Sequence, residues 1–448
     1  MDDPHEQALA AGRSLRRQVP RQAHAVWDES LRRADPLDLL EASGAGRLPG
    51  LLPLRYGRML RSPFAFMRGA AAISAADVAA GPLTGIRTQA CGDCHPANFG
   101  VFASPERRPL FDITDFDETA VAGWEFDVKR LVAGFVLLAR EQAAPRPDER
   151  AAAVEVARSY RLRLRDYALM SPVDVWYAGI DAEAMLAAAG AGRLAARVRG
   201  FLDAARTRTA DQLLRKLLAE EGNGARFRDD PPVLERLADD DETGRSFREA
   251  LADYAGAVSP ERRLLLSRFA LADVAFKVVG VGSVGLRCGV SLHLSPAGDR
   301  LALQVKEARP SVLRDHAAAC PFGHDGQRVV VGQRTIQTAS DIFLGWCADA
   351  AGRPYYVRQL RDMNKAVPAE MLTDGMLVYF ADLCGWSLAR AHARGGDALR
   401  LSGYLGAGDA CDRALADFAV AYADQCERDF ESFTKAVARG RFPAEPGR

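Results

Sequence analysis

One stretch of the 448-residue chain limits its fold more than any other, because apolar side chains recur in it with a period of two. Ala275–Val279 is strand-like, Leu286–Leu294 alternates, and Leu301–Glu307 follows a turn at 295–299. Alternation places successive side chains on opposite faces of a strand, so we predict three antiparallel strands here. Most of the remaining chain carries apolar residues at helical spacing, which predicts an α+β fold.

A glycine loop, Gly280-x-Gly282-x-x-Gly285, joins the first two of these strands. Loops of this pattern bring backbone N–H groups close to phosphates, both in dinucleotide-binding folds and in protein kinases. A dinucleotide-binding unit requires a helix after the third glycine, whereas an alternating strand follows here. In kinases, a Lys on the next strand grips the α- and β-phosphates, and Lys306 stands at that place. We therefore predict that a nucleotide is bound by Gly280, Gly282, Ser283, Gly285 and Lys306.

A second cluster of functional residues surrounds a predicted hairpin of 99–103 and 110–113. Asp93, Asn98 and Asp115 stand at its ends, which a hairpin brings together. Converging oxygen ligands suit Mg²⁺, and a further carboxylate suits a base that orients a nucleophile. Kinases place a catalytic Asp five residues before a metal-binding Asn, and a second metal-binding Asp before Phe. The same spacing here predicts Asp93 as the catalytic residue and Asn98 and Asp115 as the metal ligands.

Three segments give this cluster a family resemblance. Gly92–Phe99 resembles the catalytic loop of aminoglycoside and choline phosphotransferases, and Ile113–Asp117 resembles their metal-binding segment. Trp124–Asp127 resembles the start of their helix whose Asp braces the catalytic loop. From Ser62 onward the chain also resembles the bacterial domain-of-unknown-function 2252 family. The phosphotransferase resemblance implies ATP and Mg²⁺ as cofactors and a hydroxyl or amine acceptor. It also implies supporting roles for His95, Asp117 and Asp127.

The order of the motifs is reversed relative to kinases, in which the glycine loop precedes the catalytic loop. We therefore predict a circularly permuted, protein-kinase-like two-lobe fold. Its predicted parts are a helical N-terminal extension (1–80), a helical lobe with the catalytic loop and metal-binding hairpin (81–270), a β-rich nucleotide lobe (271–366) and C-terminal helices that complete the helical lobe (367–448). Arg358–Met363 is expected to border the adenine, with Arg358 and Leu360 as nucleotide-binding residues. The long helix ending near His392 resembles the helix that normally runs into the catalytic loop.

One departure from kinases concerns the partner of Lys306, which is normally a Glu on the next helix. No Glu occurs between Glu307 and Glu370, so Gln327, Gln333 and Asp341 are the candidates. The departure leaves two alternatives open, a nucleotide-binding pseudokinase and a nucleotidyl transferase. A metal hydrolase built on Asp93, His95 and Asp115 is a third.

Cys91-Gly-Asp-Cys94-His95 satisfies the patterns of covalent haem attachment, of a redox dithiol and of part of a zinc site. Haem attachment requires export, and the redox motif requires a βαβ context that is missing here. We therefore expect both cysteines to be bystanders, and all eight cysteines to be free thiols. Two basic residues nearby, Arg61 and Arg68, are candidates for contacting an anion. Arg68 and the helical residues 147–270 form the expected substrate-recognition surface.

Composition argues against several other classes of protein. Fifty-nine basic residues balance fifty-nine acidic ones, so no global charge points to nucleic acid or to a membrane surface. The acidic start, Met1–Glu6, is unlike a secretory signal, and no apolar run approaches the roughly 20 residues that span a bilayer. We expect a cytoplasmic protein whose partners are a nucleotide and an acceptor, most simply a small molecule.

Overall fold

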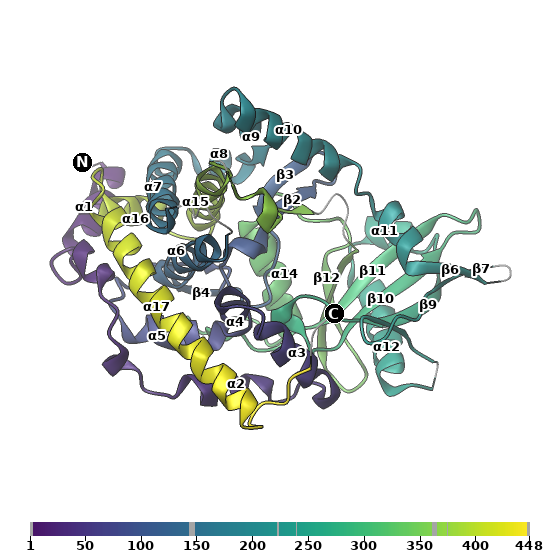
Figure 1. The fold of residues 1–448 in the computed structure, drawn as a ribbon. Helices are drawn as coiled ribbons and strands as arrows, with labels where there is room; N and C mark the ends of the chain where they lie inside the picture. Colours follow the sequence, from purple (N-terminus) through teal and green to yellow (C-terminus); the bar gives the residue numbers. More distant parts are fainter. Residues whose placement is uncertain are drawn as a thin grey trace.

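The fold combines a large set of helices with several antiparallel sheets, and Figure 1 shows the main sheet to one side of the helices. The computed structural model describes residues 3–142, 148–221, 224–238, 240–360, 365–373 and 375–445. The predicted α+β class is confirmed. None of the helices within these ranges is long and apolar enough to cross a membrane.

The main sheet has six strands in the order β12-β13-β11-β10-β9-β8, all antiparallel. Its strands are β8 (Leu234–Arg236), β9 (Ala270–Lys277), β10 (Cys288–Leu294), β11 (Arg300–Glu307), β12 (Gly345–Ala348) and β13 (Pro354–Gln359). The three strands that the period-two pattern predicts are therefore confirmed as β9, β10 and β11. Helix α14 (Asp325–Ile336) follows β11 and packs against β12 and β13.

The sheet-containing part begins upstream of residue 271, where the sequence predicts its start. The edge strand β8 pairs with β9, and helix α12 (Glu242–Ala257) packs on the sheet. Phe247, Leu251 and Tyr254 of α12 share an apolar cluster with the sheet residues Val274, Leu303 and Val357. The sequence predicts only helices over 147–270, because a three-residue strand carries no measurable periodicity.

Helix α6 (Trp124–Arg140) is the centre of the helical part, and every residue from Trp124 to Ala139 is buried. Helices α7 (Glu149–Ala168), α15 (Met376–Gly395) and α17 (Ala410–Ala438) pack around it. A helix buried on all sides must pair every polar side chain that it carries. The polar residues of α6 are therefore candidates for holding other parts of the chain.

The N-terminal and C-terminal helical segments pack against each other, as the purple and yellow parts of Figure 1 show. Helix α1 (Pro4–Leu15) packs against α16 (Ala398–Leu405), and α4 (Pro63–Gly69) packs against α17. The Arg32 guanidinium bridges Asp77 of α5 (Ala71–Ala80) and Asp429 of α17. Residues 1–80 are largely helical, as expected, with α2 (Pro36–Gly44) and α3 (Leu52–Met59) completing the segment.

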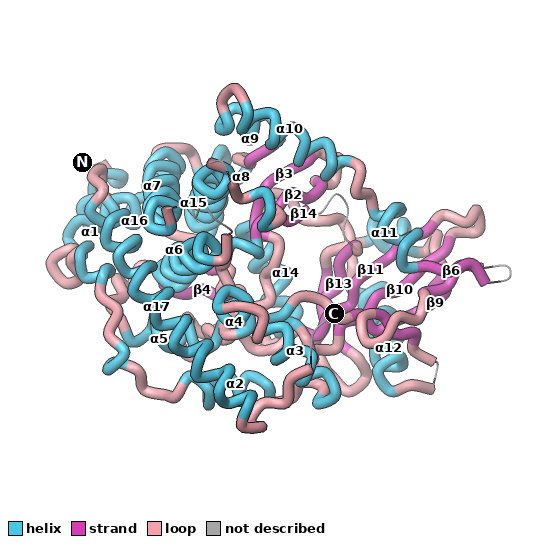
Figure 2. Tube along the Cα trace, viewed as in Figure 1, coloured by secondary structure: helices cyan, strands magenta, loops and turns pink. Residues whose placement is uncertain are grey.

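The predicted hairpin is present as β2 (Phe99–Ala103) and β3 (Pro109–Ile113), with Phe99 opposite Ile113. It belongs to a four-stranded sheet of order β14-β2-β3-β5, and Figure 2 shows these strands among helices. The remaining elements are β1 (Arg87–Ala90), β4 (Ala120–Gly123), β5 (Ile180–Asp181), β6 (Leu218–Glu221), β7 (Gly224–Phe227), β14 (Lys365–Ala366), α8 (Pro172–Tyr177), α9 (Ala182–Ala189), α10 (Arg193–Arg206), α11 (Ala210–Leu217) and α13 (Pro260–Leu266). Helix α15 ends beside β1, where the Thr88 hydroxyl donates to the His392 carbonyl over 3.2 Å.

A buried carboxylate, Asp112 on β3, ties this hairpin to the helices. It forms an ion pair with Arg390 of α15, and both side chains are fully buried. It also accepts hydrogen bonds from the Ser387 hydroxyl and from the Thr338 backbone N–H, the latter over 2.7 Å. Asp112 therefore joins three segments that are far apart in the sequence.

We expect Asp112→Asn to lower the free energy of unfolding by about 3 kcal/mol or more, because it leaves the Arg390 guanidinium buried without its counter-charge. Urea unfolding followed by circular dichroism measures the difference. The matched variant Asp417→Asn, which breaks an exposed pair with Arg150, should cost under about 1 kcal/mol. Equal losses in the two variants would contradict this role for Asp112.

Candidate functional site

The residues of the two sequence clusters meet in one cavity of about 400 Å³. It lies where the glycine loop and β11 face the hairpin and the N-terminal helices. Ten of the predicted site residues line it: Asp93, His95, Asn98, Asp115, Asp117, Gly280, Gly282, Ser283, Lys306 and Arg358. Segments separated by about two hundred residues in the sequence thus line one cavity, as the glycine-loop and hairpin predictions require.

Asp127 of α6 fixes the backbone of the loop that carries Asp93. Its carboxylate accepts the N–H groups of Cys91 at 2.7 Å and Gly92 at 2.9 Å, and lies 3.1 Å from His392 Nε2. Gly92 has a φ of 85°, and a Cβ there would lie 2.1 Å from the Glu118 carbonyl oxygen. Only glycine fits this turn. The bracing contact that the resemblance implies for Asp127 is therefore present, outside the cavity.

Arg130, one helical turn after Asp127, holds the Asp93 side chain. Its Nε donates to Asp93 Oδ1 over 2.8 Å, and its Nη2 donates to the same oxygen and to the Met67 carbonyl. These hydrogen bonds occupy Oδ1 of Asp93. Its Oδ2 lies on the side of the glycine loop, 3.8 Å from the position that a Cβ on Gly282 would have. Burial would lower the pKa of Arg130, but Asp93 raises it above its ordinary value, so the guanidinium stays charged.

His95 lies behind Asp93 and is buried. Its Nε2 is 3.6 Å from Asp93 Oδ2, and its Nδ1 has no hydrogen-bond partner among the described residues. Burial, followed by the charges of Arg68 and Arg130, holds the pKa of His95 well below its ordinary value. The imidazole is therefore neutral at physiological pH.

The two predicted metal ligands lie on adjacent walls of the cavity. Asn98 Nδ2 donates to the Asp93 carbonyl over 2.7 Å, so the amide oxygen is the atom that remains for a cation. The Thr114 backbone N–H donates to the Asn98 carbonyl over 2.8 Å, which places Asp115 next to Asn98. Burial, followed by the charge of Asp117, raises the pKa of Asp115. A divalent cation would relieve that repulsion, so this donor set fits Mg²⁺.

Lys306 is 2% exposed, and its ammonium forms an ion pair with Asp117. The same carboxylate accepts hydrogen bonds from the Tyr356 hydroxyl at 2.8 Å and the Ser283 hydroxyl at 3.2 Å. Burial would lower the pKa of Lys306, but the carboxylates of Asp115 and Asp117 hold it well above its ordinary value. The partner of Lys306 is thus an Asp of the hairpin segment. Of the helix candidates, Gln333 bonds Gln337 instead.

The glycine loop closes the cavity from the side of the sheet. It joins the antiparallel strands β9 and β10 through a short 3-10 turn at Val281–Ser283, as the kinase-like interpretation of the glycines predicts. Gly282 has no side chain to separate its backbone from Arg68 and Asp93. A phosphate under this loop would meet backbone N–H groups on one side and Lys306 on the other.

Two predicted nucleotide-binding residues do not reach the cavity. Gly285 has a φ of 90° and packs on the Arg47 side chain, whereas Leu360 is buried in an apolar cluster of the sheet. Arg358 does line the cavity and donates to Gln304 over 2.9 Å. Residues 361–363, which are also expected to border the adenine, lie outside the described residues.

Several residues of the site have no counterpart among the sequence predictions. Glu118, Arg47, Arg55 and Arg309 line the cavity, in addition to the predicted Arg68. Arg130 and Tyr356 do not line it, but they contact Asp93 and Asp117. The i, i+3 spacing of Asp127 and Arg130 on one helix was the available signal for Arg130. Arg68 lines the cavity with its Nε unpartnered among the described residues, whereas the exposed Arg61 does not line it.

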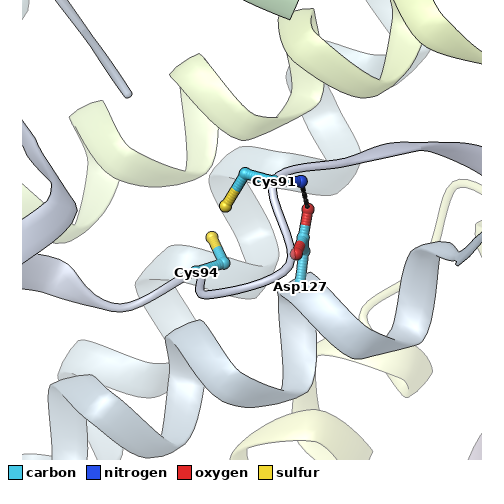
Figure 3. A group of neighbouring side chains, drawn as sticks. All are labelled: Cys91, Cys94 and Asp127. Carbon is cyan, nitrogen blue, oxygen red and sulfur yellow. Dashed lines mark hydrogen bonds between the residues drawn. The ribbon is translucent and has the colours of Figure 1, made fainter. Parts of the chain in front are cut away.

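Figure 3 shows the Cys91 and Cys94 thiols turned toward each other, with the Asp127 carboxylate directed at the Cys91 N–H. Their ligand atoms lie within 4.8 Å of one another, as a metal site would need. Asp127 is already committed to two backbone N–H groups and His392, and burial raises the pKa of the Cys94 thiol to about 11. Neutral thiols are poor metal ligands. All eight cysteines are free thiols, as expected.

Glu118 gives the cavity a pH-dependent charge. Burial raises the pKa of its carboxyl from 4.5 to about 7, although the Val312 N–H donates to it over 2.7 Å. The folded chain therefore holds this proton more tightly than the unfolded chain does. The free energy of unfolding falls as pH rises from about 4.5 to about 7, and stays lowered above that.

We expect Glu118→Gln to gain stability relative to the unchanged protein between pH 5 and pH 8, because the variant has no carboxyl to ionise. Urea unfolding at both pH values gives the two differences in free energy. A difference that is the same at both pH values would show that Glu118 titrates normally.

A sequence comparison gives the chain a family. The sequence profile described as "Uncharacterized protein conserved in bacteria (DUF2252)" matches residues 47–436. No curated protein and no solved structure matches the chain significantly, so the kinase-like arrangement stays a prediction. Because the match covers most of the sequence, the chain belongs to the DUF2252 family.

Proposed function

We propose that the protein is an ATP- and Mg²⁺-dependent phosphotransferase of kinase-like, circularly permuted architecture. The observation that carries the proposal is the meeting of Lys306, Asp93 and Asp115 in one cavity beneath the glycine loop. Each motif alone is weak, but their joint position in one cavity supports a phosphoryl-transfer site. The α+β fold with a separate antiparallel sheet is compatible with two lobes.

The contact between α15 and β1 supports the permutation. The Thr88 hydroxyl bonds the His392 carbonyl, and a Cβ on Gly395 would lie 2.5 Å from Gln89 Cβ. Helix α15 therefore ends against the strand that leads to Asp93. In an unpermuted chain, one short connection there would run from the helix into the catalytic loop.

The proposed reaction transfers the γ-phosphoryl group of ATP to an acceptor hydroxyl or amine. The acceptor atom forms a bond to the γ-phosphorus while the bond from that phosphorus to the β,γ-bridging oxygen breaks. ADP leaves with the electron pair, and Asp93 Oδ2 takes the acceptor proton. Because Arg130 holds Oδ1 of Asp93 in place, the main contribution of Asp93 is to orient the acceptor.

The remaining cavity residues would hold the donor. Lys306 would contact the α- and β-phosphates, and the backbone of Gly280–Ser283 would cover the β- and γ-phosphates. Asn98 and Asp115 would hold Mg²⁺, which supplies neutralisation of the phosphate charge. Arg68, whose Nε is unpartnered among the described residues and which interacts electrostatically with Asp93, would contact the transferred group.

We expect ATP with Mg²⁺ to raise the melting temperature of the protein, and Lys306→Met to remove most of that rise because it deletes the phosphate contact. A fluorescence thermal-shift assay measures both. The matched variant Lys435→Met, at an exposed site on α17, should respond like the unchanged protein. An equal response of Lys306→Met would refute the assignment of Lys306.

We expect Asp93→Asn to abolish transfer, by at least about a thousandfold, while ATP and Mg²⁺ still bind. The assay incubates the protein with a bacterial metabolite extract and ATP labelled at the γ- or the α-phosphate. Label transferred from the γ-position alone supports the proposal. Label from the α-position would establish nucleotidyl transfer, and nucleotide binding without any transfer would establish a pseudokinase.

A further inference from the structure

Three arginines of the cavity wall lie outside the catalytic cluster. Arg47 follows α2, Arg55 belongs to α3, and Arg309 comes two residues after β11. We propose that these three side chains form a second anion-binding site, which holds a phosphate or carboxylate group of the acceptor. The inference deepens the proposed function and rests on it for the identity of the bound molecule as the acceptor.

The arginines converge on one short segment at the carboxyl end of α2. Arg47 Nε donates to the Ser43 carbonyl over 3.0 Å, and Arg55 Nη2 lies 3.2 Å from the Ser43 hydroxyl. Arg309 Nη2 donates to the Ala45 carbonyl over 2.6 Å. Arg47 Nη1 also donates to the Val284 carbonyl over 2.6 Å. Positive groups at the end of a helix stabilise it, but these contacts leave part of each guanidinium uncommitted.

The cluster has no matching negative charge. None of the three arginines forms an ion pair within the part of the chain that the structure describes. Burial and the neighbouring guanidinium groups lower the pKa of Arg47 to about 9 and that of Arg55 to about 10. Among the carboxylates, Glu118 has the largest opposing effect and raises the pKa of Arg47. Buried like charges without counter-charge are costly unless a ligand completes them.

Arg55 gives the most direct support for an anion site. It lines the cavity at 1% exposure, and its Nε and Nη1 have no hydrogen-bond partner among the described residues. A buried charged donor left unpaired is expensive, and a bound oxyanion would pair with such donors. The Ser43 and Gly69 contacts of Arg55 use Nη2 only. Nε and Nη1, which lie on different edges of the guanidinium, therefore remain as separate donors for an oxyanion.

The arginine site and Asp93 share a support, the last turn of α4. The Gly69 carbonyl accepts from Arg55 over 2.7 Å, and the Met67 carbonyl accepts from Arg130 over 2.8 Å. Arg130 in turn holds Asp93. An acceptor whose anionic group lies at Arg55 is thereby placed along the turn that positions Asp93. The geometry favours an acceptor that carries an oxyanion and, at some distance from it, a hydroxyl or amine.

The test titrates the full chain with inorganic phosphate in the absence of nucleotide, at constant ionic strength kept with sodium chloride. Calorimetry gives the affinity, and acetate in a parallel titration separates phosphate from carboxylate preference. Arg309→Gln is the main variant, because this side chain is only half-buried and the fold should survive its loss. Arg55→Lys keeps the charge but removes the guanidinium. Arg413→Gln, in an exposed pair with Asp409, is the matched control.

We expect either anion to bind the unchanged protein and Arg413→Gln alike, and about tenfold or more weakly in Arg309→Gln and Arg55→Lys. Anion affinity that both cavity variants retain, or the absence of binding to the unchanged protein, would overturn the proposal. Loss of phosphate binding in Lys306→Met alone would also overturn it, since the anion would then occupy the nucleotide site. A failure of the proposed phosphotransfer would show instead as no response to ATP with Mg²⁺ in any variant.

Discussion

The geometry of the site depends on one buried helix face, that of Asp127 and Arg130 on α6. Asp127 holds the loop backbone at Cys91 and Gly92, and Arg130 holds the Asp93 carboxylate. His392 lies against Asp127, and its Nδ1 is 2.7 Å from the Tyr160 hydroxyl. A chain of buried hydrogen bonds is rigid only when every member is satisfied, and here it links three helices to the loop. The position of Asp93 is therefore set by the helical core, independently of any ligand.

Charge divides the cavity into two regions. Asp93, Asp115 and Asp117 gather on one side, where Lys306 and Arg130 compensate part of their charge. Arg47, Arg55 and Arg309 gather on the other, where no carboxylate is paired with them among the described residues. A cation with its nucleotide suits the first region, and an oxyanion suits the second. Both regions contain charge that a bound ligand would balance.

Local patterns in the sequence predicted the parts of the site well. The period-two strands, the hairpin at 99–113 and the convergence of Asp93, Asn98 and Asp115 all follow from turn chemistry and alternation, and the structure has them. Two nucleotide-binding assignments were misplaced with respect to the cavity: Gly285 serves a tight turn, and Leu360 packs in the sheet. Spacing alone does not distinguish a phosphate-facing residue from its neighbour.

The contacts that sequence reasoning missed are long-range. Lys306 finds its carboxylate on Asp117, 189 positions away, because β11 and the hairpin segment meet only in the folded chain. The arginine cluster unites residues after α2, in α3 and after β11, none of which carries a motif. Strand β8 is too short for its side chains to show an alternating apolar pattern. Such features depend on packing between distant segments, which no local pattern encodes.

The proposed reaction requires that one cavity binds a nucleotide and a divalent cation together. Electron paramagnetic resonance of Mn²⁺, used in place of Mg²⁺, measures this directly from the signal of the free ion. We expect the protein to remove free Mn²⁺ strongly only when ATP is present, beyond the binding by ATP itself, and Asp115→Asn to lose this extra binding. Equal Mn²⁺ binding with and without ATP, or full binding by Asp115→Asn, would contradict it.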